Sequence, residues 1–273
     1  MNPPRTVCLV ASLALACQVF VATIAQAKEK ASDASSDLPA QIEPSQESWH
    51  ARYKKQENAP NPAKQLLNTD QEPDLTAAGF ESLISGDDLS AWTPRGGTCE
   101  FVLEGGEIVG TCVPGSESTY LSTNRSDYAD FIFSGELYWE EDGNTGVMFR
   151  AAHRMEKDRS GKDRQVVFGP QAEMEGFSTG RGWSGGIYGQ SCGGYFYPLW
   201  LKKHAQVREA LKPDAWNRIT IEAKGNTVKT WINGIPASHW IDDGTYAAGY
   251  FGLQIHKGKS GKVRFRNLLV KEL

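Results

Sequence analysis

The sequence predicts an all-β fold, an antiparallel β-sandwich, for residues 79–273. Short runs rich in β-branched and aromatic residues recur over this stretch, with glycine and asparagine turn signals between them. Apolar and polar residues alternate along several runs, as is typical of strands with one buried face. Helical pattern is almost absent, apart from residues 201–214, which could form two turns of helix before Pro213.

Residues 1–27 have the features of a secretory signal peptide. Arg5 precedes an apolar run over residues 7–24, and Ala-Gln-Ala at 25–27 supplies the small residues of a signal-peptidase site. We therefore expect a secreted or periplasmic protein. Lipid anchoring at Cys17 and an uncleaved anchor are alternatives. Beyond this segment no run reaches the roughly 20 apolar residues of a membrane span.

Residues 28–78 are predicted to be a disordered linker. They are rich in Ser, Ala, Asp, Glu, Gln and Pro and show no sustained hydrophobic periodicity. The stretch SWHARYKKQ, residues 48–56, could form a short helix, but nothing in the pattern requires that helix to pack against the domain.

Composition and charge limit the kinds of partner. The chain carries 29 Lys and Arg against 33 Asp and Glu, a formal net charge of −4 at pH 7, and 40% of its residues are hydrophobic. This mixed, slightly acidic balance argues against a nucleic-acid partner. The sequence contains no phosphate-binding loop, dinucleotide fingerprint, nucleophile elbow or paired Cys-x-x-Cys motif.

The segment CEFVLEGGEIVGTC, residues 99–112, is predicted to form a β-hairpin that turns on its two central glycines. Counting outward from the turn, Cys99 faces Cys112 at a non-hydrogen-bonded pair, where Cα atoms lie about 4.5 Å apart, within disulfide range. Because secreted proteins meet oxidising conditions, we predict a structural Cys99–Cys112 disulfide. Cys192 is then unpaired, and is better explained as a small residue in a glycine-rich turn than as a nucleophile.

The later segments show strand alternation most clearly. Strands are expected within residues 127–141, 146–153, 249–258 and 263–273. Residues 217–238 are expected to form three strands with turns at a Gly-Asn and an Asn-Gly dipeptide. The residues expected on the buried faces are Phe131, Phe133, Leu137, Trp139, Phe251, Leu253 and Ile255.

The segment GPQAEMEG raises the main functional question. As a strand, it would place Gln171, Glu173 and Glu175 on one face and Ala172 and Met174 on the other. Two carboxylates about 7 Å apart on one face of a sheet repel each other unless a useful group lies between them.

Other outward-facing positions also differ from an ordinary solvated sheet. Amide, aromatic, carboxylate, guanidinium and imidazole groups are those with which proteins bind sugars, because rings stack on pyranose C–H faces and polar groups bind hydroxyls. We therefore predict a saccharide-binding cleft, on the assumption that these strands are neighbours. The candidate residues are Asn144, Arg150, Gln171, Glu173, Glu175, Tyr188, Gln254 and His256.

The candidates have alternative roles. Arg150 could pair with a surface carboxylate, and His256 could cap a loop. The stretch YFYPLW, residues 195–200, is either an aromatic wall of the cleft or core packing beneath a loop. Metal binding by Glu173, Glu175 and a histidine is conceivable, although no local ligand spacing supports it. The pattern requires no cofactor, and a divalent metal ion stays an open alternative.

Several motifs occur in the order found in one known family: GFESLISGDDLSAW, GNTGVMFR, GPQAEMEG followed by GGIYG, DAWNRITIEAKGNTVKTWINGIPA, GYFGLQIHKG and VRFRNLLVKEL. Together they make residues 79–273 resemble the 3-keto-disaccharide hydrolase domain family. The resemblance implies a concanavalin A-like jelly roll of the lectin/glucanase type. It also implies an oxidised glycoside as the saccharide ligand. Where the family often has Gln-Ala-Asp-Ile-Asp, this chain has Gln-Ala-Glu-Met-Glu, so both acids are one methylene longer.

The resemblance implies chemistry on glycosides already oxidised to a ketone at C3. The ketone acidifies the C2 hydrogen, a base removes it, the resulting enolate expels the C1 substituent, and water addition completes a net hydrolysis. This route needs a base, an electrophile for the enolate oxygen and an acid for the leaving group. We expect Glu173 or His256 to be the base, and Arg150 or a divalent ion to stabilise the enolate. The expected substrate-binding residues are Asn144, Gln171, Glu175, Tyr188 and Gln254.

Two readings from other functional classes compete with an enzyme. This kind of fold hosts lectins as readily as hydrolases, so a non-catalytic carbohydrate-binding module is the first alternative. A surface scaffold domain tethered by the N-terminal linker is the second.

Overall fold

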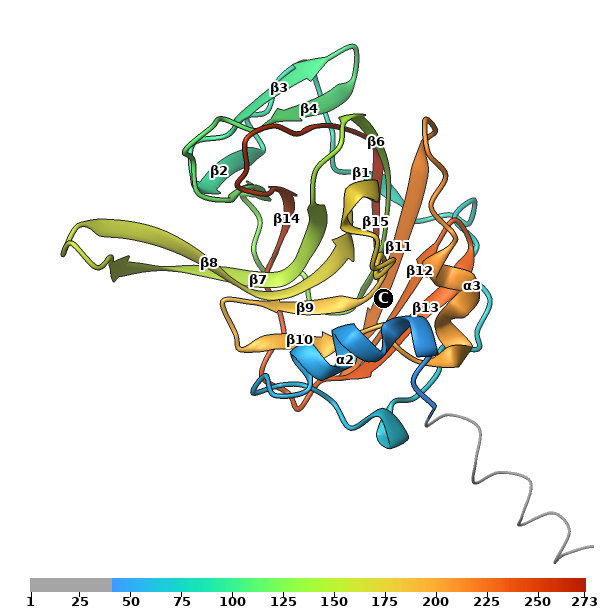
Figure 1. Ribbon diagram of the computed structural model, residues 1–273. Coiled ribbons are helices and arrows are strands. Elements are labelled where there is room, and N and C mark those ends of the chain that lie inside the picture. Colours follow the sequence, from blue (N-terminus) through green and yellow to red (C-terminus); the bar gives the residue numbers. More distant parts are fainter. Residues whose placement is uncertain (1–40) are drawn as a thin grey trace, which may run out of the picture. The chain divides into compact units, whose positions relative to one another are not determined.

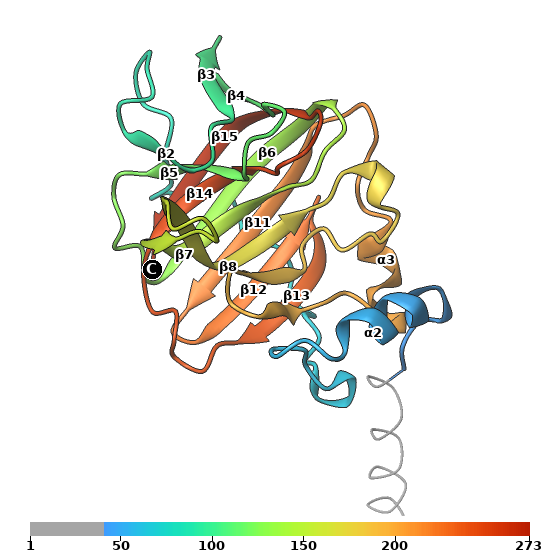
Figure 2. The ribbon, with the colours of Figure 1, turned by 60° about the vertical axis from the view of Figure 1, so that its left-hand side comes forward.

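The computed structural model describes residues 41–273, which form two antiparallel sheets (Figures 1 and 2). The predicted signal peptide and the first part of the predicted linker lie outside the described residues. The strands are β1 (Glu81–Ser82), β2 (Trp92–Gly96), β3 (Glu100–Glu104), β4 (Glu107–Thr111), β5 (Thr119–Thr123), β6 (Phe131–Glu141), β7 (Thr145–Lys157), β8 (Asp163–Met174), β9 (Ile187–Gln190), β10 (Gly194–Tyr197), β11 (Asn217–Lys224), β12 (Thr227–Ile232), β13 (Ile235–Ile241), β14 (Tyr250–Ile255) and β15 (Lys262–Glu272).

The strand order in the two sheets defines a sandwich. One sheet runs β13-β12-β11-β6-β15-β4-β3, with β1 beside β15, and the other runs β10-β9-β8-β7-β14-β5-β2. Helical structure in residues 41–273 is short and includes α2 (Glu47–Tyr53) and α3 (Ala205–Arg208). Within the same residues no helix is both long and apolar enough to cross a bilayer. The predicted fold class, an antiparallel β-sandwich, is confirmed.

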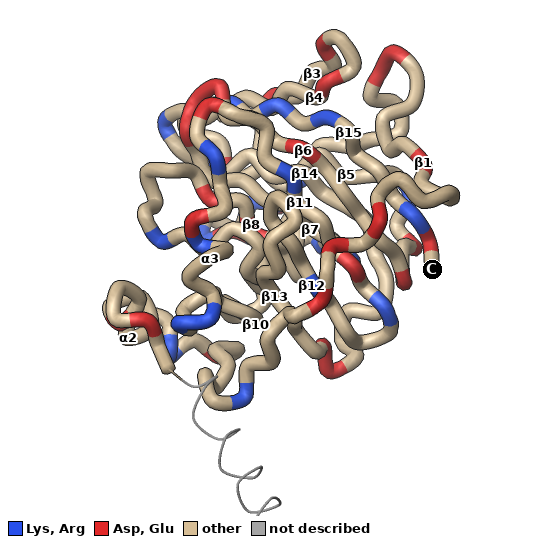
Figure 3. The backbone as a smooth tube through the Cα atoms, turned by 90° about the vertical axis from the view of Figure 1, so that its right-hand side faces the viewer, with Lys and Arg blue, Asp and Glu red and all other residues tan. Residues whose placement is uncertain are grey.

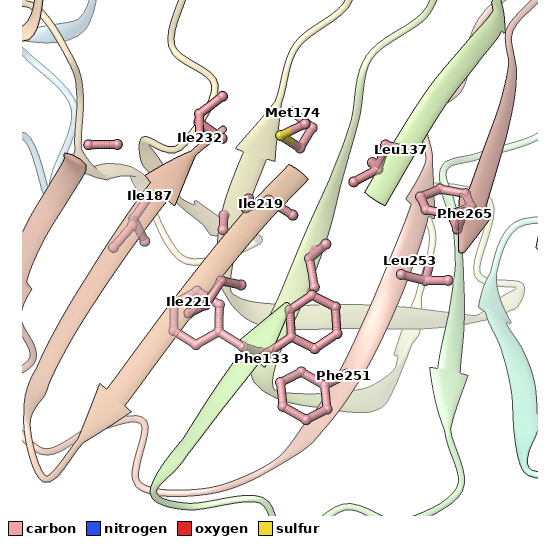
Figure 4. Packing of buried hydrophobic residues seen from close by; sticks show 14 of the residues in the cluster. Phe133, Leu137, Met174, Ile187, Ile219, Ile221, Ile232, Phe251, Leu253 and Phe265 are labelled. Atoms are coloured by element: carbon pink, nitrogen blue, oxygen red, sulfur yellow. The ribbon is translucent and has the colours of Figure 1, made fainter. Parts of the chain in front are cut away.

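The core lies between the two sheets and follows the predicted alternation. Figure 4 shows Phe133 of β6 next to Phe251 of β14, which belong to opposite sheets. Their ring centroids lie 5.0 Å apart. All seven residues expected on buried faces belong to this core. Full burial of such a side chain stabilises the fold by about 1.5–3 kcal/mol. The alternation of apolar and polar residues along the strands therefore accounts for much of the stability of the sandwich.

The expected hairpins are present as well. β11, β12 and β13 pair in sequence, and their turns fall at the Gly-Asn and Asn-Gly dipeptides. In the second turn Asn233 has φ 51° and Gly234 has φ 85°. Two consecutive residues with positive φ give a turn whose twist matches that of the strands, and asparagine followed by glycine adopts it with little strain.

The cysteine hairpin has the predicted register but not the predicted bond. β3 and β4 pair Glu104 with Glu107 and Glu100 with Thr111, so Cys99 and Cys112 come next. Both are buried free thiols, and the Cys99–Cys112 disulfide is therefore not found. Burial, and then the neighbouring Cys99 thiol, raises the pKa of Cys112. Turn geometry determines which residues are neighbours, whereas bond formation also depends on an oxidant.

Surface charges of both signs are interspersed along the backbone (Figure 3). Arg264 of β15 illustrates the pattern, because its guanidinium pairs with Glu104, Glu107 and Glu140. Exposed pairs of this kind contribute little to stability, about 0–1 kcal/mol each.

The predicted disordered linker is wrong for residues 41–78. The first part of this segment lies at the edge of the sandwich where β10 and β13 are found (Figure 1), and Ile42 forms a β-bridge with Leu201. Farther along, Asn68 and Glu72 bond to residues of β12 and β11. The short helix expected at residues 48–56 is present as α2, and Tyr53 packs against Trp183 with ring centroids 5.5 Å apart. The sequence pattern did not reveal this docking because the apolar residues that pack on the core, among them Ile42, Trp49 and Leu67, follow no helical or strand period.

Three buried tryptophans depend on this N-terminal segment. The indole N–H of Trp183 donates to Gln46 Oε1 at 2.7 Å, that of Trp200 donates to Gln65 Oε1, and that of Trp231 donates to the Asp70 carbonyl at 3.0 Å. These indoles are 0–1% exposed and have no access to solvent. A buried donor without an acceptor is destabilising, so the segment is part of the fold.

Gln65→Leu is expected to lower the free energy of unfolding by about 1–3 kcal/mol. The substitution leaves the Trp200 indole N–H without its acceptor, and it removes the donor to the Pro198 carbonyl, now 3.0 Å from Gln65 Nε2. Urea denaturation followed by tryptophan fluorescence measures the loss. Exposed Lys64→Ala, one residue away, is the control and should stay within about 0.5 kcal/mol of the parent. Equal stability of the two variants would contradict the structural role of the segment.

Candidate functional site

A cavity of about 400 Å³ opens on the outer face of the sheet that contains β8. Its floor comes from β8, β14 and β5, and its sides come from β9, β10, the loop after β8 and the N-terminal segment. The residues that line this pocket include Tyr53, Gln56, Tyr120, Asn144, Arg164, Gln171, Glu173, Arg181, Tyr188, Tyr195, Gln254 and His256. The fold therefore brings six of the eight candidates predicted from the sequence together in this pocket. Arg150 and Glu175 are the two that do not line it.

The floor is a row of side chains that the strand register aligns. Glu173 of β8 pairs with Gly146 of β7, Gly146 pairs with Gln254 of β14, and Gln254 pairs with Tyr120 of β5. Residues directly paired on neighbouring strands point to the same face. Hydrogen bonds join the floor laterally: Gln171 Nε2 donates to Gln254 Oε1 at 2.6 Å, and Gln254 Nε2 donates to the Tyr120 hydroxyl at 3.1 Å.

Gly146 leaves the space in which the Gln171 amide lies. A Cβ at this position would overlap Gln171 Nε2 and would lie 2.8 Å from the Ala172 carbonyl oxygen. Gly146→Ala is therefore expected to displace the amide and lower the free energy of unfolding by about 1–3 kcal/mol. Chemical denaturation tests this against Gly252→Ala, whose added carbon meets Met148 at 3.3 Å and leaves the amides in place. A loss no greater than that of Gly252→Ala would contradict the role given to Gly146.

Three acceptor oxygens in the pocket lack a protein partner among the described residues. They belong to Asn144, Gln171 and Glu173, at Oδ1, Oε1 and Oε2 respectively. Buried polar atoms are almost always hydrogen-bonded. The amide oxygens of Asn144 and Gln171 can only accept hydrogen bonds, so the group that completes them is a donor, and a ligand rich in hydroxyl groups has that chemistry.

Glu173 is in an environment that favours its protonated form. Burial first, and then the negative charge of Glu175, raises the pKa of Glu173 to about 8, although Arg181 and Asn144 oppose the rise. A carboxyl group that titrates near the working pH can both donate and remove a proton. Perturbation of this kind, inside a concave pocket, is typical of a functional group.

Arg181 was missed by the sequence analysis. It follows β8 in a glycine-rich loop and donates from Nε to Glu175 Oε1 at 2.7 Å, with a second bond from its terminal nitrogen to the same oxygen. The sequence signal that could have identified it is a single arginine in this glycine-rich loop, six positions after Glu175. The Trp183 and Tyr195 rings lie 4.7 and 5.1 Å from its central carbon. These contacts hold the guanidinium at the pocket wall.

Glu175 supports the loop instead of the ligand. Its second carboxylate oxygen accepts from the backbone N–H of Trp183 at 3.0 Å, and its own backbone N–H donates to Ser184 Oγ at 2.9 Å. The expectation that Glu175 binds substrate is therefore corrected. Glu175 comes after the last residue of β8, Met174, so the strand alternation no longer fixes its direction.

Arg150 is also corrected, because a β-bulge turns it away from the pocket. The pairing of β7 and β8 shifts between Met148 and Ala152, and Arg150 has φ 46°. Met148 and Ala151 share the outer apolar cluster. The extra residue therefore removes Arg150 from the face it was expected to share with Met148. Its guanidinium donates to backbone carbonyls, among them that of Ala129 at 2.8 Å, and pairs with Asp130.

The remaining candidates differ in depth. His256 is exposed at the rim, where its Nδ1 lies 2.7 Å from the Lys257 carbonyl oxygen. Tyr188 is half-buried on the wall, 4.9 Å from Tyr195 between ring centroids. Residues 195–200 prove to be core packing, and Tyr195 also lines the pocket. In residues 41–273 no group of three or more His, Cys, Asp or Glu side chains is placed to hold a metal ion.

Comparisons with known proteins bear on the fold and the family. One family model, described as the 3-keto-alpha-glucoside-1,2-lyase-like domain, matches residues 79–271. No curated protein matches the chain. A Bacillus subtilis protein of unknown function with a galectin-like fold is similar at 14% identity over 74% of this chain and 98% of that chain, with a TM-score of 0.52. This likeness agrees with the jelly-roll β-sandwich.

Two further solved structures are similar in fold with lower scores. One, from Parabacteroides distasonis, is described as a candidate glycosyl hydrolase, with 19% identity over 75% of this chain and all of that chain (100%) and a TM-score of 0.49. The other is the carbohydrate-binding module CBM66 from Bacillus subtilis, with 17% identity over 71% of this chain and 99% of that chain and a TM-score of 0.40.

Proposed function

We propose, from the premise that the chain belongs to the 3-keto-alpha-glucoside-1,2-lyase-like domain family, that its pocket cleaves glycosides already oxidised at C3. The observation that carries the proposal is Glu173, a buried carboxyl group that lines the pocket, has a pKa of about 8 and lies beside unpartnered amide oxygens. Such a group can take a proton from a weak carbon acid, and the oxygens around it match sugar hydroxyls.

The proposed reaction begins at C2 of the oxidised sugar. The Glu173 carboxylate removes the C2 proton, and the electron pair moves onto the C3 oxygen as an enolate. The enolate then re-forms the ketone, a C1–C2 double bond is made, and the bond from C1 to the leaving oxygen breaks. The leaving oxygen takes a proton, and addition of water to the double bond gives net hydrolysis with no change in oxidation state.

We assign to Arg181 the role that was expected of Arg150, which is to stabilise the enolate oxygen. Three of its five N–H groups are engaged, two with Glu175 and one with the Tyr53 hydroxyl at 2.9 Å. The two that remain can donate to an enolate oxygen that develops in the pocket. Glu175 offsets much of the positive charge, so the contribution is directional hydrogen bonding rather than net charge.

The other pocket residues divide into proton transfer and orientation. His256 is at the rim, where a leaving group would exit, and an imidazole there can supply the proton that the leaving oxygen needs. Tyr188 and Gln254 remain the residues proposed to orient hydroxyls. Gln171 joins them because its amide is fixed by Gln254 and its own oxygen is unpartnered.

A non-catalytic saccharide-binding module is the second candidate. The observation that favours it is the same pKa of about 8, because at pH 7 most Glu173 side chains are protonated and act as hydrogen-bond donors. In that case the pocket would hold a sugar without removing a proton.

Incubation with a methyl 3-keto-α-glucoside and with the unoxidised methyl α-glucoside, followed by mass spectrometry, tests the enzymatic proposal. We expect release of methanol from the keto substrate only, since the unoxidised sugar has no acidified C2 hydrogen. Parallel incubations with a chelator test the divalent-ion alternative. Binding of the keto sugar without product over hours would leave the binding module as the function.

Export belongs to the same proposal and rests on the sequence of residues 1–27. We expect the protein recovered from outside the cytoplasm to begin after Ala27. N-terminal sequencing of that material is the measurement, and a lipid-modified N-terminus at Cys17 would replace this expectation.

A further inference from the structure

We propose that residues 47–58, which precede the family region, form one wall of the pocket, with Gln56 as a specificity-determining residue and Tyr53 as a positioning residue. The proposal rests on the proposed function and adds that Gln56 contacts the oxidised sugar ring, not the leaving group. The family match begins at residue 79, yet both side chains line the pocket together with Glu173.

The turn between β9 and β10 is shaped to receive this wall. Gln56 Oε1 accepts from the backbone N–H of Tyr195 at 3.0 Å, and Asn58 Nδ2 donates to the Cys192 carbonyl. Gly194 has φ 113°, and a Cβ there would overlap the Gln56 amide. Only glycine combines that backbone conformation with the close approach of a neighbouring chain. The wall is therefore held in a fixed position.

Gln56 can bind a ligand with the half of its amide that faces away from this contact. Its oxygen is occupied by the Tyr195 N–H, and the NH₂ group remains as a donor at the pocket. A fixed donor matches a sugar ring oxygen or hydroxyl oxygen. A neutral hydrogen bond of this kind contributes about 0.5–1.5 kcal/mol, or a factor of about 2 to 13 in affinity.

Tyr53 acts through Arg181. Its hydroxyl accepts from a terminal nitrogen of Arg181 at 2.9 Å, and its ring lies 5.2 Å from that of Tyr195. This hydrogen bond fixes the orientation of the Arg181 guanidinium, which is also hydrogen-bonded to Glu175. It therefore fixes the direction of the two N–H groups that have no partner among the described residues. Tyr53 therefore influences the reaction without touching the reacting atoms.

The order of strands indicates which part of the substrate meets the wall. Gln56 lies over the turn that joins β9 and β10, on one side of β8, and His256 follows β14 on the other side. Glu173 on β8 lies between them. Because His256 is the proposed proton donor to the leaving oxygen, the leaving group extends toward β14. The wall then faces the far edge of the oxidised ring.

The test measures kcat and KM for two substrates, a methyl 3-keto-α-glucoside and a 3-keto-α-glucosyl-glucose disaccharide. Gln56→Ala is expected to raise KM about 2- to 13-fold by the same factor for both, because the ring they share loses one hydrogen bond. Tyr53→Phe is expected to lower kcat with little change in KM. Exposed Lys55→Ala on the same segment is the control and should match the parent.

The outcomes are distinguishable from those of the proposed function. If Gln56→Ala raises KM only for the disaccharide, the assignment of Gln56 to the oxidised ring is overturned. If KM is unchanged for both substrates, the proposal that this segment forms a wall of the pocket is overturned. If the parent binds the methyl 3-keto-α-glucoside in calorimetry but releases no product, only the proposed cleavage reaction is contradicted. A weaker Kd for Gln56→Ala would then still support the proposal that residues 47–58 form a wall of the pocket. A parent that neither binds nor cleaves this sugar overturns both.

Discussion

Glu173→Gln is expected to lower the turnover of a 3-keto-glycoside by about 10²- to 10⁴-fold, the usual contribution of a general base. The amide keeps the size and hydrogen bonding of a protonated carboxyl group but cannot accept the C2 proton. Saccharide binding, measured by calorimetry, should therefore change only a few fold. Turnover in the parent should increase with pH up to about 8, as Glu173 loses its proton.

Exposed Glu100→Gln is the matched control, since it makes the same chemical change on β3. A Glu173→Gln variant that keeps full turnover would remove this residue from the mechanism and leave His256 as the proposed base. A parent whose turnover is flat between pH 5 and 9 would contradict titration of Glu173 in that range.

The same substitution has a consequence for stability that does not depend on any substrate. The folded-state pKa of Glu173 is raised from 4.5 to about 8, so above pH 4.5 the unfolded chain releases a proton that the folded protein keeps. Stability of the parent therefore falls relative to Glu173→Gln as pH rises from about 4.5 to about 8. The full difference is about 5 kcal/mol. Denaturation of both proteins at pH 4, 6 and 8 measures it, and a gap that does not widen with pH would contradict the raised pKa.

Arg181→Met is expected to lower the free energy of unfolding by about 3–5 kcal/mol, because it leaves a buried carboxylate without its counter-charge. The side chains of Arg181 and Glu175 are 9% and 2% exposed, so water cannot replace the lost partner. The double variant Arg181→Met with Glu175→Gln should recover much of the loss, since no buried charge remains. Loss of the nearby guanidinium should also raise the pKa of Glu173 further and move the rise in turnover to higher pH.

Arg164→Met is the control for this experiment. Arg164 also lines the pocket, but its side chain is 51% exposed and pairs with Glu156 on the surface. Its loss should lower stability by no more than about 1 kcal/mol. If Arg181→Met is no less stable than Arg164→Met, the buried pair is not a stabilising contact.

Much of the fold could be predicted because strands repeat every two residues and turns have local chemistry. The hairpin register that places Cys99 beside Cys112 follows from counting outward from a turn, and the core positions of β6 and β14 follow from alternation. The same rule placed Gln171 and Glu173 on the outer face. These predictions needed no knowledge of distant contacts.

The predictions of site residues failed where contacts between distant parts of the chain, or irregular backbone, determine the position of a side chain. Arg150 has an ordinary strand sequence, and only the bulge in β7 shows that its side chain leaves the sheet face. Glu175 and Arg181 find each other in a loop, where no periodicity applies. Tyr53 and Gln56 lie in a polar stretch whose packing depends on amide groups that a hydrophobicity pattern does not detect.

The tryptophans that donate to the N-terminal segment bear on how this protein should be produced. Residues 41–273 belong to one compact unit, whereas the family boundary falls at residue 79. A recombinant fragment trimmed to that boundary would lose the acceptors of Trp183, Trp200 and Trp231 and would strip the cover from a hydrophobic edge. Such a fragment invites aggregation during expression, so the shortest useful version for crystallisation or screening begins near residue 41.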